Sequence, residues 1–168
     1  MKKATQIAVL VFVLLAIVAV PLYLYMRQHA GQEGMIQVKG AVNNPANVTV
    51  GELKRFPSVT IQVTLTSSSK PEENGSFDYT GVPLREILEQ TDVVDSATSV
   101  YVQASDGFGT TLPLQEVMQN EQMILAYAKD GEPLKPLTEG GEGLVRLVIA
   151  TDEFAQRWIR DVTVIAVS

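Results

Sequence analysis

The chain has 168 residues, which is enough for one ordinary domain and excludes two large ones. It contains no cysteine, so disulfides, thiolate metal sites and a cysteine nucleophile are excluded, and its one histidine excludes a histidine-rich zinc site. From residue 31 onward, 19 acidic residues outnumber the basic ones. Such a surface repels a phosphate backbone, and we therefore expect no nucleic-acid partner.

A long apolar segment lies near the N-terminus. Residues 7–26 carry no charge and, apart from Pro21, belong to the apolar residue types. A helix of this length, at ~1.5 Å per residue, crosses a hydrocarbon core ~30 Å thick. Lys2 and Lys3 precede the segment, and the positive-inside rule then places the N-terminus in the cytoplasm. A cleaved signal peptide and a buried core helix are the alternatives.

These features divide the chain into four parts. We expect a cytoplasmic N-terminus at residues 1–6, a single transmembrane anchor at 7–26, a linker at 27–34 and an outer domain at 35–168. The expected location is the cell membrane, with the outer domain outside the cytoplasm. The expected partners are the membrane itself and either a membrane protein or a small-molecule ligand.

The first half of the outer domain shows two alternating segments and one capped helix. Residues 36–40 and 59–65 alternate apolar and polar side chains, which predicts strands. The spacing of Thr49-Val50-Gly51-Glu52 is that of a capping box and predicts a helix at 49–56. The following segment, 66–78, is rich in turn-forming residues, and we expect no regular structure there.

The second half intermingles strands with short helices. In chain order we expect a helix at 83–91, a strand around Val100 and Val102, a hairpin turn at Asp106-Gly107, a helix at 113–118, and strands at 123–128, 144–150 and 158–167. Residues 140–143 predict a flexible connection. Because no long βαβ crossover is present, these elements predict an α+β domain with one mixed sheet.

The outer domain also carries short motifs in a defined order. They are GAVNNP from Gly40, TVGELKRFP from Thr49, YTGVPL from Tyr79, SDGF from Ser105, DGEPL from Asp130 and RLV from Arg146. In this order and spacing they resemble the oxidoreductase molybdopterin-binding domain family, of which sulfite oxidase is the best-known member. The resemblance covers residues 38–164 and implies a sulfite oxidase-like α+β fold, with a molybdopterin cofactor held in a cleft.

The chain departs from this family at the metal ligand. The resemblance implies a cysteine thiolate on molybdenum at the end of the strand 59–65, where this sequence has Ser67 as the nearest match. A serine hydroxyl is a harder and much less acidic ligand than a thiol. The segment that follows offers Lys70 against several carboxylates, and a cofactor phosphate would be repelled there.

Four residues are the candidate cofactor-binding residues: Ser67, Asp106, Arg146 and Arg157. Arg146 lies in an apolar strand, where it either meets an anionic ligand or pairs with an internal carboxylate such as Asp106, and we favour the ion pair. Asp106 precedes a glycine and is either a general base or, as we favour, a turn cap. Arg157, with Arg160 nearby, forms either an anion site or a solvated strand surface.

Two functions are compatible with these observations. We favour a non-catalytic binding or assembly module that holds no cofactor and no metal, because the cysteine ligand is absent and His29 lies in the linker. The alternative is a molybdopterin-dependent oxidoreductase in which Ser67 replaces the cysteine as metal ligand. These two functions differ in whether molybdenum and pterin accompany the protein.

Overall fold

The computed structural model describes residues 19–21, 34–65 and 74–168. Residues Gly34–Ser168 form one compact unit. The predicted anchor, 7–26, lies outside the described residues except for 19–21, which are helical. No helix in the described part of the chain is both long and apolar enough to cross a membrane. The anchor therefore stays a prediction.

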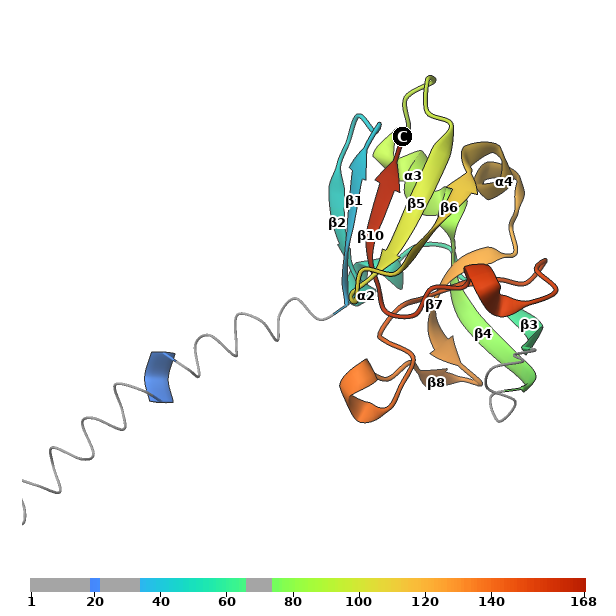
Figure 1. The fold of residues 1–168 in the computed structure, drawn as a ribbon. Coiled ribbons are helices and arrows are strands. Elements are labelled where there is room, and N and C mark those ends of the chain that lie inside the picture. Colours follow the sequence, from blue (N-terminus) through green and yellow to red (C-terminus); the bar gives the residue numbers. More distant parts are fainter. Residues whose placement is uncertain (1–18, 22–33, 66–73) are drawn as a thin grey trace, which may run out of the picture. The chain divides into compact units, whose positions relative to one another are not determined.

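The first of two sheets has five strands in the order β2-β1-β10-β5-β6 (Figure 1). They are β1 (Met35–Gly40), β2 (Ala46–Thr49), β5 (Ser99–Ala104), β6 (Gly109–Pro113) and β10 (Val162–Val167). The last strand, β10, lies parallel to the first, β1, with Val38 opposite Ile165. All other pairs in this sheet are antiparallel, so the sheet is mixed.

The second sheet is antiparallel and contains β3, β4, β7, β8 and β9. Its strands are β3 (Val59–Leu65), β4 (Gly75–Pro83), β7 (Met123–Lys129), β8 (Glu132–Pro133) and β9 (Arg146–Ile149). Our prediction of one mixed sheet is therefore wrong, because the strands divide between two sheets. Apolar alternation reports which face of a strand is buried, but it does not report which strands pair.

The predicted helices are present. They are α2 (Val50–Leu53), α3 (Leu84–Thr91) and α4 (Leu114–Gln119), together with the 3-10 helices η2 (Leu137–Glu139) and η3 (Ala155–Arg157). The capping box is confirmed, because the Thr49 side chain accepts a hydrogen bond from the Glu52 N–H and the Glu52 carboxylate accepts one from the Thr49 N–H. However, α2 ends at Leu53, three residues earlier than predicted.

Several strands differ from the predictions, and three of them are informative. The strand β2 was not predicted, because four residues show too little alternation. The strand β4 begins at Gly75, inside the segment 66–78 where we expected no regular structure; Phe77 and Tyr79 alternate with polar residues there, but the turn formers before them obscure this pattern. The strand β10 begins at Val162 rather than at residue 158, because Ile159 forms an isolated bridge with Leu147 and Asp161, with a φ of +49°, interrupts the extended backbone.

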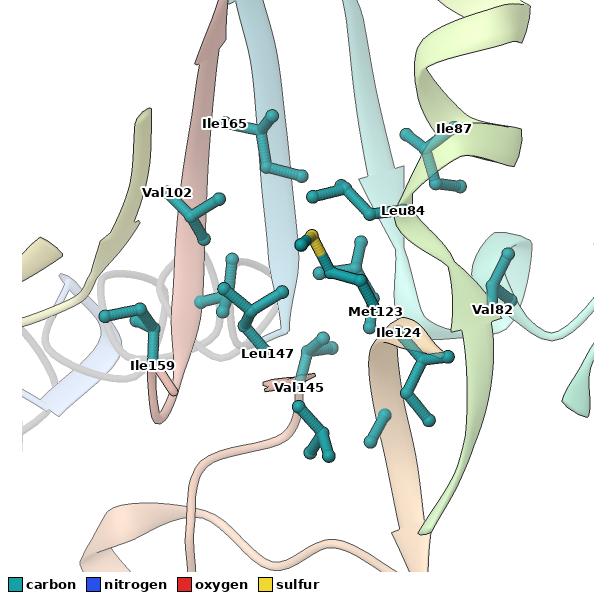
Figure 2. Close-up of a cluster of buried hydrophobic side chains, with 14 of the residues drawn as sticks. Val82, Leu84, Ile87, Val102, Met123, Ile124, Val145, Leu147, Ile159 and Ile165 are labelled. Carbon is teal, nitrogen blue, oxygen red and sulfur yellow. The ribbon is translucent and has the colours of Figure 1, made fainter. Parts of the chain in front are cut away.

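The hydrophobic core lies between the two sheets and α3. Val102 and Ile165 from the first sheet meet Ile124 and Leu147 from the second, and Ile87 of α3 packs beside them (Figure 2). Each of these side chains is at most 1% exposed. Burying one such aliphatic side chain contributes roughly 1.5–3 kcal/mol, so this cluster fixes the sheets against each other.

The cap of α2 gives the first testable prediction. We expect Thr49→Ala to lower the free energy of unfolding by about 1 kcal/mol, the usual cost of losing a threonine cap. Urea denaturation followed by circular dichroism measures this change. Thr49→Ser keeps the hydroxyl and is the matched control; if both variants lose stability equally, the cap is not the cause.

Candidate functional site

Arg146 is the one charged residue in the buried part of the described chain. It begins β9, whose four residues are all buried, and only 3% of its surface is exposed. A buried guanidinium keeps its charge, so the surrounding chain must supply compensating groups. Those groups come from β4, from β7 and from the loop that precedes β9.

Glu142 and Tyr79 contact the guanidinium directly. Arg146 Nη1 forms an ion pair with the Glu142 carboxylate and donates a hydrogen bond of 3.0 Å to the Tyr79 hydroxyl. That hydroxyl in turn donates to Glu142 Oε2 over 2.9 Å, and Lys129 Nζ donates to Glu142 Oε1 over 2.9 Å. One carboxylate thus accepts hydrogen bonds from three side chains. We call Tyr79, Lys129, Glu142 and Arg146 the arginine network.

Aromatic rings enclose this network. The guanidinium carbon of Arg146 lies 5.6 Å from the centroid of the Tyr79 ring and 5.3 Å from that of Trp158, within the range of cation–π attraction. The two rings meet edge to face at 6.2 Å. Lys129 Nζ lies 3.7 Å from the centroid of Phe77. The rings therefore shield the charges from solvent and hold both cations in place.

The loop before β9 is shaped to place Glu142. Gly143 has a φ of +85°, and a Cβ there would lie 2.3 Å from the backbone of Asp161, so only glycine fits. The Asp161 N–H donates a hydrogen bond of 3.1 Å to the Glu142 carbonyl. The segment that we predicted to be a flexible connection thus carries the main partner of Arg146.

The network shifts two pKa values in opposite directions. Burial alone would raise the pKa of Glu142, but the Arg146 charge and hydrogen bonds from Lys129, Arg146 and Tyr79 outweigh burial and lower it to about 2. Burial raises the pKa of Tyr79 well above its ordinary value, against the opposing charge of Arg146. Near neutral pH, Glu142 is therefore charged and Tyr79 keeps its proton.

The structure separates the candidate residues. The ion pair that we favoured for Arg146 is confirmed, but its partner is Glu142; naming Asp106 as an example was wrong. Asp106 lies in the exposed β5–β6 hairpin, where Oδ1 accepts a hydrogen bond of 2.9 Å from the Phe108 N–H, as a turn cap does. Ser67 lies outside the described residues. The glycines on both sides of Glu142 suggested a flexible segment. No local sequence signal shows that Glu142 is the ion-pair partner of Arg146.

Arg157 forms a second network, which we call the Arg157 network. Its Nη1 and Nη2 donate to the two carboxylate oxygens of Glu116 at 3.0 and 2.8 Å, and its Nε donates to Asp152 Oδ2 at 2.9 Å. Hydrogen bonds to Asp152 and Glu116 raise its pKa further above the ordinary arginine value. Arg157 is therefore neither a free anion site nor a merely solvated strand residue.

A cleft of about 560 Å³ lies elsewhere, at the β2 edge of the first sheet. We call it the edge cleft. Residues 44–48, the end of α2 and its following turn, and one face of α3 line it. This volume lies within the usual range of ligand pockets, roughly 300–1,000 Å³. Of the candidate cofactor-binding residues, the structure describes Asp106, Arg146 and Arg157, and none of these three lines the cleft.

Comparisons with known proteins agree with this fold. Residues 27–168 match the family of the oxidoreductase molybdopterin binding domain, and the chain belongs to that family. It is 32% identical over 101 residues to the uncharacterized oxidoreductase YuiH of Bacillus subtilis, a match that spans 60% of this chain and half of that protein. The crystal structure of the sulfane dehydrogenase SoxCD from Paracoccus pantotrophus superposes with a TM-score of 0.69 at 22% identity, over 81% of this chain and 38% of that one. The fold is therefore sulfite oxidase-like.

The two arginine networks do not fit a phosphate-bearing cofactor. The cations Lys129, Arg146 and Arg157 face three carboxylates, those of Glu142, Glu116 and Asp152. Within the two networks these charges balance, so the networks themselves present no excess positive charge to a cofactor phosphate; Arg160, whose charge also acts on Tyr79, lies outside them. The Nε of Arg146 is buried without a hydrogen-bond partner among the described residues, but one N–H does not offset this charge balance.

We expect Glu142→Gln to lower the free energy of unfolding by about 3–5 kcal/mol at neutral pH, the usual cost of removing one partner from a buried ion pair. The folded-state pKa of Glu142, about 2, lies below the ordinary value of 4.5, so its contribution is complete above the ordinary value and is lost as the pH falls toward 2. The difference between the two proteins should therefore shrink on acidification.

Urea denaturation at a series of pH values measures both effects. Glu132→Gln removes a carboxylate from the exposed strand β8 and is the matched control, with little expected change. Equal stability of wild type and Glu142→Gln at neutral pH would contradict the role of the arginine network.

Proposed function

We propose that this chain is a membrane-anchored, non-catalytic binding or assembly domain that retains the fold of its family. The observation that carries the proposal is the charge balance of Arg146 and Arg157. Each of these arginines is already paired with carboxylates of the same chain. At Arg146, an anionic cofactor or substrate would have to displace the largely buried Glu142 carboxylate, which then loses the partner that compensates its charge.

The edge cleft supplies the concave surface that a binding domain needs. It lies at the edge of the first sheet, whereas the arginine network belongs to strands and a loop of the second. A ligand there would leave the ion pair of Arg146 and Glu142 undisturbed. Family membership alone is weaker support for catalysis, because one fold carries many functions.

The alternative is a molybdopterin-dependent oxidoreductase with Ser67 as the metal ligand. Membership in the molybdopterin-binding family supports it. The chain spans about half of YuiH and a smaller share of SoxCD, so what those whole proteins do does not pass directly to this chain. The two functions differ in an observable way, namely the presence of molybdenum and pterin.

Metal and pterin analysis of the protein purified from its native host decides between the two functions. We expect neither molybdenum nor pterin at a stoichiometric level. The native host is required, because a heterologous host can lack the cofactor synthesis. Stoichiometric molybdenum with pterin would overturn the proposal, and loss of that metal in Ser67→Ala would then identify Ser67 as its ligand.

Membrane topology is tested separately. The apolar segment 7–26, with Lys2 and Lys3 before it, supports an anchor with its N-terminus in the cytoplasm. We expect protease added to intact cells, after removal of any wall, to digest the outer domain. A cytoplasmic protein serves as the control for cell integrity. An outer domain that is digested only after lysis would refute the proposed orientation.

A further inference from the structure

The edge cleft follows the free edge of β2. Five consecutive residues, 44–48, line it. A cleft above one face of a strand would be lined by alternate residues, since successive side chains point to opposite faces. In the described part of the chain β2 pairs with β1 alone, so its other edge faces the cleft.

The capping box shows which backbone groups of β2 point into the cleft. The Thr49 N–H donates to Glu52 Oε2 over 2.9 Å and is therefore turned away from β1. In an antiparallel pair, every second residue directs its N–H and C=O away from the partner strand. Asn47 is thus the residue of β2 that presents both groups to the cleft. Among the described residues, no backbone hydrogen bond joins β2 itself to a strand other than β1. Before β2, the Asn44 N–H donates to the Thr91 carbonyl over 3.0 Å, and this bond closes that end of the cleft.

The walls of the cleft combine apolar surface with one cation. Val48, Phe56 and Ile87 form its apolar floor, and Arg55 lies in the turn that follows α2. Arg55 forms no hydrogen bond or ion pair with any residue that the structure describes, unlike Arg146 and Arg157. Glu52, the carboxylate of the lining, is held by the Thr49 N–H and hydroxyl. The cleft therefore offers a guanidinium that forms no ion pair with a described residue, near the Glu52 carboxylate, whose pKa is lowered by the hydrogen bonds from Thr49 and further by this charge.

We propose that the edge cleft binds an extended, acidic peptide segment of a partner protein. The segment adds to β2 as an extra strand and exchanges hydrogen bonds with Asn47. It places an apolar side chain on Phe56 and pairs a carboxylate side chain with Arg55. In this mode of recognition the main chain supplies affinity, and the side-chain pockets supply specificity. The inference rests on the proposed binding function and names the ligand class of that site.

A second copy of this chain fits the cleft less well than a partner peptide. The strand that it would offer, β2, reads ANVT and contains no carboxylate to meet Arg55. An acidic segment of a different protein satisfies both the backbone edge and the arginine.

The test uses the full-length chain in detergent micelles and a phage-displayed library of random peptides. We expect the enriched sequences to contain aspartate or glutamate close to an apolar residue. A labelled synthetic peptide of the enriched sequence is then titrated against the protein by fluorescence anisotropy. Absence of any enriched sequence that binds as a free peptide would overturn the proposal.

Two variants test the two contacts. Arg55→Gln removes the cation, and Asn47→Pro removes the outward N–H at an edge position, where proline is tolerated. We expect each to weaken binding of the synthetic peptide at least about tenfold, roughly 1.4 kcal/mol. Lys39→Gln removes an exposed charge from β1, outside the cleft, and should leave binding unchanged. Equal loss in Lys39→Gln would point to non-specific charge attraction and contradict the proposal.

A change in the peptide tests strand pairing without altering the protein. N-methylation of alternate peptide residues should abolish binding when the methylated N–H groups are those that face β2. It should preserve binding when the methyl groups lie on the intervening residues. Binding that no methyl group affects would overturn strand addition. Dimerisation of the free protein that Asn47→Pro abolishes would show that a second copy is the occupant instead.

The two proposals can fail independently. Stoichiometric molybdenum in the native protein, with peptide binding as expected, would overturn the non-catalytic role and leave the edge cleft as a peptide site. Absence of peptide binding in a protein free of molybdenum would overturn the peptide site alone.

Discussion

The buried charge of Arg146 is the constraint on which the second sheet depends. An arginine side chain cannot lose its proton at accessible pH, and an uncompensated buried charge costs several kcal/mol. Glu142, from the loop before β9, pairs with Arg146, and Tyr79 of β4 accepts a hydrogen bond from it. Lys129 of β7 donates a hydrogen bond to Glu142. Two strands distant in sequence, β4 and β7, are thereby joined to β9 through the loop that precedes it. Gly143 is required in that loop, because it lets the loop pass against the backbone of Asp161.

The same compensation bears on what the family fold does in this chain. A guanidinium that is neutralised inside the protein attracts an external phosphate or oxyanion only weakly. Arg157 repeats the pattern, with Glu116 and Asp152 as its partners. The fold is thus retained while these two arginines serve internal pairing. The stability of a fold and the chemistry at its surface are separate properties, and here the charges of Arg146 and Arg157 contribute to stability.

Local sequence patterns predicted the elements whose signals are local. The capping box at Thr49, the alternation in residues 59–65 and the apolar stripe of α3 depend on neighbours within a few residues, and all three are present. Strand pairing between β1 and β10 and the ion pair of Arg146 depend on contacts made only in the folded chain. No spacing rule reveals them, which is why one sheet was expected and Glu142 was overlooked. Sequence motifs indicated the family, whereas the pairing of its arginines required the structure.

The edge cleft combines a rigid floor with a short edge. Ile87 lines the cleft and also belongs to the hydrophobic core, so the floor is already ordered before a ligand arrives. The cost of ordering therefore falls mainly on the peptide. A four-residue strand offers few main-chain hydrogen bonds, each worth about 0.5–1.5 kcal/mol net, and an exposed ion pair adds about 0.2–1 kcal/mol. Such a site binds modestly by itself.

The proposed anchor would place the site beside other membrane proteins, where tethering raises the effective concentration of a partner segment to about the millimolar range. Modest affinity at the edge and attachment to the membrane thus suit each other, because the high effective concentration compensates for the low affinity of a short strand.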